Sequence, residues 1–127
     1  MNAEVKTMND IERRDLRKRT KVFALRIIKL YASLPKSTEA QVLGKQVLRS
    51  GTSVGAHYRE AKRARSTAEF ISKIEGALQE LDETIYWLEL LTESGIVPEA
   101  RLTNLKREAE ELMKMLVSSA KTAKKHK

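Results

Sequence analysis

Hydrophobic residues recur every three or four positions along most of the chain, in four blocks separated by short breaks. This spacing places the apolar side chains of each block on one face of an α-helix. The breaks hold residues that begin or end helices: Pro35, the capping-box pairs Thr38 with Gln41 and Ser66 with Glu69, the C-terminal stop Gly95, and Pro98. The pattern therefore predicts four helices joined by short connections.

Each block carries an apolar stripe that we expect to face a common core. Short connections make consecutive helices antiparallel. The predicted fold is all-α, an up-down-up-down antiparallel four-helix bundle, with residues 1–127 forming a single domain. The stripes comprise Leu16, Phe23, Ile27, Leu30 and Leu34; Leu43, Val47, Ser50, Val54, Tyr58 and Ala61; Phe70, Ile74, Ala77, Leu81, Ile85 and Leu88; and Leu102, Leu105, Ala109, Leu112 and Leu116.

Amino-acid composition indicates the cellular compartment in which this bundle works. The 127 residues include no cysteine, which suits a reducing compartment and excludes thiolate metal sites. No apolar run approaches the roughly 20 residues that span a bilayer, and the N-terminus lacks the apolar stretch of a secretory signal. We expect a cytoplasmic protein without a membrane partner.

The net charge of +8 lies at the two ends of the sequence. Residues 12–21 and residues 121–127 each carry +4, whereas residues 22–120 contain 14 basic and 13 acidic side chains. An anionic partner such as RNA or DNA is therefore expected at the ends. With six aromatic residues in all, binding should depend on shape and charge rather than on base stacking. The predicted phosphate ligands are Arg13, Arg14, Arg17, Lys18, Arg19, Lys21, Lys121, Lys124, Lys125 and Lys127.

Gly51 and Gly55 lie inside the second block, where each glycine costs a helix about 1 kcal/mol relative to alanine. The apolar phase is the same before and after them, which favours a continuous helix whose small flank admits a neighbouring helix closely. A local kink at Ser50 and Gly51 is the alternative.

Lys45, Arg49, Arg59 and Arg63 share the face opposite the apolar stripe of this helix. They form either a ridge that tracks phosphates or one half of a set of ion pairs. Because residues 38–65 carry +4 and residues 66–95 carry −6, pairing between the second and third helices, within or between subunits, is favoured.

The sequence contains no recognisable set of catalytic residues. A di-iron bundle requires Glu-x-x-His on two helices, and this chain offers His57-x-x-Glu60 once. No nucleophile, base and orienting group occur together. We expect no enzyme activity, no metal and no cofactor.

Two blocks of sequence carry a family resemblance: RSGTSVGA at 49–56, and ALQELDETIYWLELL at 77–91. With Glu60, Ala61, Ser66, Phe70 and Ile71, they resemble the bacterial four-helix bundle proteins grouped as the 23S ribosomal RNA intervening-sequence proteins, over residues 20–118. His57 departs from that pattern, which usually has asparagine, and Glu75-Gly76 stands where an apolar or small pair is expected.

The resemblance implies a homo-oligomeric ring, commonly a pentamer. It also implies kinship with the accessory variability protein of diversity-generating retroelements, a basic ring that binds nucleic acid and a reverse transcriptase. We interpret the shared residues as architectural, with Arg49 paired to a glutamate of the third helix and Trp87 at a helix or subunit contact. These structural or interface residues are Arg49, Gly51, Gly55, Glu60, Glu80, Glu83 and Trp87.

Two functions remain open from the sequence. The first is a non-enzymatic oligomer that binds RNA or DNA through its basic terminal segments. The second is a protein–protein scaffold, for a reverse transcriptase or another protein, that makes no direct contact with nucleic acid. Reversing the charges of residues 13–21 should distinguish them, since only the first depends on those charges.

Overall fold

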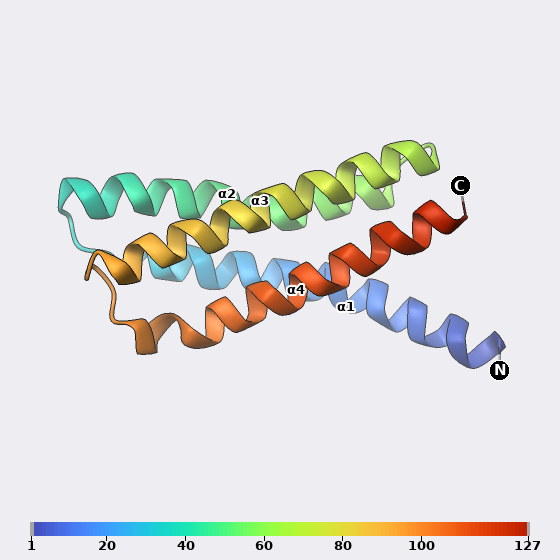
Figure 1. Ribbon diagram of the computed structural model, residues 1–127, viewed down its shortest axis with the longest axis horizontal. Coiled ribbons are helices and arrows are strands. Elements are labelled where there is room, and N and C mark those ends of the chain that lie inside the picture. Colours follow the sequence, from blue (N-terminus) through green and yellow to red (C-terminus); the bar gives the residue numbers. More distant parts are fainter. Residues whose placement is uncertain (1, 127) are drawn as a thin grey trace.

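The structure, a computed structural model, describes the backbone of residues 2–126 and the side chains of residues 16–126. It contains four helices, α1 (Asn2–Ala32), α2 (Thr38–Lys62), α3 (Thr67–Glu93) and α4 (Glu99–Lys125), and the described residues form no strand. Consecutive helices are antiparallel (Figure 1). The predicted all-α four-helix bundle is confirmed.

Packing between the helices is uneven. Neighbours in sequence pack together, most extensively α2 with α3, and α1 closes the bundle by a looser contact with α4. The core holds the predicted stripes of all four helices, and Phe23, Ile27, Leu81 and Leu112 are completely buried. Phe70, Leu43 and Ile85 were predicted in the core but are only partly buried at its edge.

The helix ends follow the expected chemistry with two shifts. Ser66 caps α3 by accepting a hydrogen bond from the Glu69 amide, and Gly95 ends that region in the left-handed conformation. The capping box predicted at Thr38 and Gln41 is wrong: Ser37 is the N-cap of α2. Pro98 is the N-cap of α4 rather than its first residue.

The Gln41 side chain does not form the predicted capping box but bonds to the α1–α2 connection and to α1. Its amide donates a hydrogen bond to the Pro35 carbonyl, and its oxygen accepts one from the Tyr31 hydroxyl. Gln41 therefore ties the α1–α2 connection to both helices.

Helix α2 runs without a break through its glycines, so the kink is excluded. The glycines face α1: a Cβ atom added at Gly51 would lie 2.8 Å from Ile27 Cγ1, and one at Gly55 would lie 3.1 Å from Thr20 Oγ1. The close approach predicted for this flank is present, and α1 is the helix that uses it.

Candidate nucleic-acid interface

Three basic segments that are distant in sequence lie at one end of the bundle. An even number of antiparallel helices puts both chain ends beside the α2–α3 connection, and this arrangement is seen at the right of Figure 1. We call this region the basic end and define it as residues 16–21, 59–76 and 111–126. It joins the two predicted basic segments to a third, the connection around residues 62–65.

Charge is strongly concentrated there. The basic end contains 13 basic and 4 acidic side chains, for a net charge of +9. The remainder of the side chains described, residues 22–58 and 77–110, contains 8 basic and 9 acidic ones, for a net charge of −1. The positive charge of the described bundle is thus concentrated at one end, where it can attract an anionic partner.

The basic end includes most of the predicted phosphate ligands, in two groups. Arg17, Lys18 and Lys21 are exposed on α1, while Lys121 and Lys125 are exposed near the end of α4. Arg13, Arg14 and Lys127 lie outside the residues whose side chains the structure describes.

Two of the predicted ligands already bind carboxylates. Arg19 forms a two-pronged salt bridge with Glu108 at 2.6 and 3.0 Å, which ties α1 to α4, and it also donates to the sulfur of Met115. Lys124 forms a longer ion pair with Glu75, at 3.4 Å. We therefore assign Arg19 to holding the bundle closed rather than to a phosphate.

Arg63 and Arg65 are further functional candidates: the sequence placed Arg63 on a face for which ion pairing was favoured over phosphate binding, and it assigned no role to Arg65. Both are exposed, and neither side chain forms an ion pair with any described residue. Their signal in the sequence was the run KRAR at 62–65, directly before the α3 cap Ser66. The excess of acid on α3 favoured pairing, but the nearest of those acids, Glu69, accepts a hydrogen bond from the backbone amide of Arg65 rather than from its side chain.

The pairing expected of Arg49 is present within the chain. Its guanidinium donates to Glu80 at 3.0 Å and to Glu83 at 2.7 Å. Partial burial acts to lower the pKa of Arg49, but the charge and hydrogen bond of Glu80, followed by those of Glu83, outweigh it and raise the pKa. Beside this cluster the Thr84 hydroxyl donates to Ser50 in the core, at 2.8 Å. The two signature blocks of the sequence thus bind each other across α2 and α3.

A second ion pair joins the same helices nearer the basic end. Lys73 donates to Glu60 at 2.8 Å, and this hydrogen bond and charge lower the pKa of Glu60 and raise that of Lys73. His57 and Gly76, both departures from the family pattern, are in contact, because a Cβ at Gly76 would lie 3.1 Å from His57 Nδ1. The glycine makes room for the imidazole.

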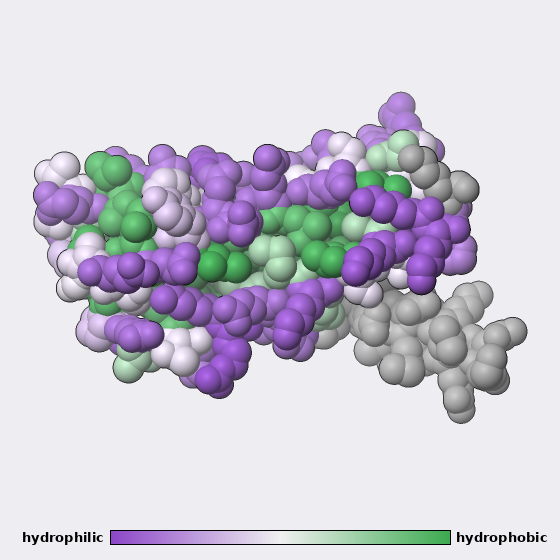
Figure 2. Space-filling view, viewed as in Figure 1, coloured by the Kyte–Doolittle hydropathy of each residue, from purple (hydrophilic) through white to green (hydrophobic). Residues whose placement is uncertain are grey.

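Trp87 lies on α3, partly buried, with its ring 5.2 Å from that of Tyr86. Its Nε1 and the Nδ1 of His57 are buried and make no hydrogen bond among the described residues. A shallow groove between α3 and α4 is lined by Leu78, Met113 and Val117. Figure 2 shows a hydrophobic strip along the face that is turned to the viewer.

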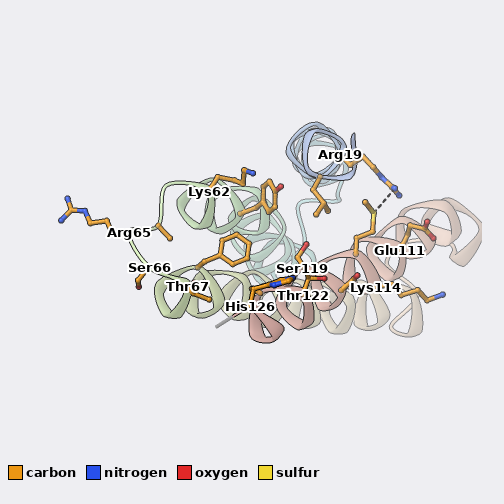
Figure 3. A pocket seen from close by; sticks show the side chains of 17 residues that line it. Arg19, Lys62, Arg65, Ser66, Thr67, Glu111, Lys114, Ser119, Thr122 and His126 are labelled. Carbon is orange, nitrogen blue, oxygen red and sulfur yellow. Dashed lines mark hydrogen bonds between the residues drawn. The ribbon is translucent and has the colours of Figure 1, made fainter. Parts of the chain in front are cut away.

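A cavity of about 770 Å³ opens at the basic end, where all four helices contribute side chains. Figure 3 shows Ser119 projecting from α4 into the space between the helices, while Arg65 and Lys114 extend away from it at the rim. The walls include Leu16, Tyr58, Phe70 and Met115, and the cavity therefore combines apolar sides with a polar, mainly basic rim.

The described side chains offer no metal-binding site. Among the described side chains, no three of His, Asp and Glu come together as ligands for an ion. The part of the chain that the structure describes also holds no helix with the length and apolar character needed to cross a bilayer.

Fold and surface together define a small all-α bundle protein with one strongly basic end. The chain belongs to the 23S rRNA-intervening sequence protein family, whose family model matches residues 12–118. It is similar to a crystal structure of a protein of unknown function from the S23 ribosomal protein family of Bacteroides thetaiotaomicron VPI-5482. The two are 39% identical, the match covers 87% of this chain and 98% of that one, and the TM-score is 0.82. No match was found among curated proteins.

Proposed function

We propose that this protein is a non-enzymatic, self-associating helical bundle that binds RNA or DNA through its basic end. The observation that carries the proposal is the net charge of +9 on one end of a bundle whose remaining described part is nearly neutral. Such a patch releases counterions from a phosphate backbone, which supplies affinity without sequence readout. A scaffold that makes no direct contact with nucleic acid would use these charges for solubility, which does not require them to lie together at one end.

Binding should therefore fall steeply as salt is raised. For each phosphate contact, the logarithm of the association constant should change by about −0.9 per tenfold increase in salt for duplex DNA, and by about −0.7 for single strands. Fluorescence anisotropy with labelled RNA and DNA between about 50 and 200 mM salt measures this slope. Absence of binding at the lowest salt, or affinity that does not change with salt, contradicts the proposal.

Self-association is supported by apolar side chains that α1 leaves outside the core. Val22, Leu25 and Ile28 are 45%, 56% and 46% exposed, within two turns of the helix whose contact with α4 is the loosest in the bundle. A second copy of this chain would bury them, as an oligomer interface does.

Light scattering tests this surface directly. Wild type should have a multiple of the single-chain mass, fivefold for the pentamer that the family resemblance implies, and Leu25→Lys with Ile28→Lys should reduce it. Val42→Lys is the matched control, because Val42 is 57% exposed on α2. A monomeric wild type, or equal loss of mass in both variants, rules out this interface.

A further inference from the structure

The cavity at the basic end has the size and lining of a ligand site. Its volume of about 770 Å³ is within the range of pockets that enclose small organic molecules, about 300–1,000 Å³. It lies at the centre of the region that carries the net charge of +9 rather than beside it. A ligand here would thus enter through the most positive part of the molecule.

Four hydroxyls that line the cavity differ from most helical hydroxyls of this bundle. Thr52, Ser53 and Thr103 each donate to the carbonyl four residues earlier in their own helix, the usual partner of a helical hydroxyl. Thr67 on α3 and Ser118, Ser119 and Thr122 on α4 line the cavity, and none of them forms a hydrogen bond with another described residue. These hydroxyls are available to a ligand as donors and acceptors.

The other walls are apolar and aromatic. Tyr58 is almost fully buried and forms part of the wall, but Phe70 is only partly buried, so part of its ring is accessible. Phe70 was predicted in the core from its helical spacing, and its place at the cavity explains why it is not fully covered. An accessible ring beside free hydroxyls offers one surface for a planar heterocycle and others for its polar edge.

Cations follow the rim and continue beyond it. Lys114 lines the cavity from α4 and Arg65 lines it from the α2–α3 connection, and Glu111 is the one acid among the described lining residues. Lys121 and Lys125 share the flank of α4 that carries Lys114, because the three recur at intervals of seven and four residues. A chain of phosphates leaving the cavity would therefore meet further cations.

We propose that this cavity receives one unstacked nucleotide of a single-stranded nucleic acid, with its base against Phe70 and its flanking phosphates on the rim. The inference rests on the proposed function and names the form of nucleic acid that the basic end prefers. A duplex keeps its bases stacked and paired, so it can use the cations but not the cavity. The cavity therefore distinguishes single strands from duplexes, which the charge alone does not.

The test compares a uridine decamer with a ten-base-pair duplex in anisotropy titrations at fixed salt. Phe70→Ala removes the ring, and Ser119→Leu fills the cavity without changing its charge. Each should weaken binding of the decamer about tenfold, the loss typical of one base–aromatic stack, and leave the duplex within twofold. The controls are Leu78→Ala and Ser72→Leu, which make the same kinds of change on α3 at the other groove.

The possible outcomes distinguish binding in the cavity from binding to the charged surface alone. If the wild type binds both nucleic acids but neither variant reduces decamer binding, the nucleotide site is wrong and the proposed function stands. Equal losses for decamer and duplex, or a change of oligomer mass in the cavity variants, also overturn it. If the wild type binds neither nucleic acid, both proposals fail. Photo-crosslinking of 5-bromouridine should label peptides containing Phe70 or Met115, and labelling confined to the exposed lysines contradicts the inference.

Discussion

Reversing three charges at the basic end, by Arg63→Glu, Arg65→Glu and Lys121→Glu, should reduce the salt dependence of nucleic-acid binding by two to three phosphate contacts. Each lost contact lowers the slope by about one and weakens binding to every sequence alike. None of the three side chains forms an ion pair with a described residue and all are exposed, so the fold should be unaffected. Anisotropy titrations at several salt concentrations measure the slope, and circular dichroism verifies the fold.

A second triple variant, with the same change of net charge outside the basic end, serves as the control. Comparing the two shows whether binding depends on the position of the charges or on net charge alone. Lys36→Glu, Lys45→Glu and Arg107→Glu change the net charge by the same amount at exposed sites. Lys45 lies 17 residues before the end of α2, roughly 25 Å along the helix, and Arg107 lies 14 residues before Lys121 on α4, roughly 21 Å. Both separations exceed twice the screening length of about 8 Å at physiological salt. The second variant should therefore bind almost as wild type. Equal losses in both variants would show that net charge alone attracts the nucleic acid.

The same pair of variants separates the two functions left open by the sequence. If nucleic acid is bound through the basic end, only the first variant loses it. If the protein acts as a scaffold and the charges serve solubility, neither variant should change capture of a protein partner, and the wild type should show no salt-dependent binding of nucleic acid. The two variants are expected to differ in nucleic-acid binding only because the fold brings one set of the altered charges together at the basic end.

The sequence predicted the helices well because the information needed for them is local. Apolar spacing located all four, and the phase match across Gly51 and Gly55 gave an unbroken α2. Arg49 found its partners on α3, as the opposite charges of the two segments indicated. The error at Ser37 is of the same local kind, since two adjacent hydroxyl residues compete for one N-cap.

The candidate site was harder to predict because it is built by topology. Residues 16–21, 62–65 and 121–126 form one surface only after the chain has crossed the bundle four times. Counting charges along the sequence therefore located the two basic ends, but the charge of residues 38–65 between them was assigned to pairing with the third helix. The cavity depends on how far α1 lies from α4, which helical periodicity does not encode, and so Phe70 was assigned to the core.

Gly51→Ala should lower the free energy of unfolding, although alanine favours a helix by about 1 kcal/mol relative to glycine. The new Cβ would lie 2.8 Å from Ile27 Cγ1 and 3.0 Å from Cγ2. Ile27 is completely buried and β-branched, so its side chain has little freedom to move aside. Overpacking of this kind costs about 1–3 kcal/mol, so after the helix gain is subtracted we expect a net loss of up to about 2 kcal/mol by urea denaturation.

Gly76→Ala is the matched control, because it makes the same change in α3 at a site where the neighbour can yield. There the added Cβ meets the half-buried His57 ring at 3.1 Å, and a small rotation of the imidazole relieves the contact. Unfolding should then need as much denaturant as in wild type, or more.

A double-mutant cycle identifies Ile27 as the cause of the loss at Gly51. In an Ile27→Ala background the contacting atoms are absent, so Gly51→Ala should become stabilising by up to about 1 kcal/mol. If Gly51→Ala is equally destabilising in both backgrounds, the small residue serves something other than the approach of α1. If the sign reverses, the glycines of α2 are present because α1 packs against their backbone.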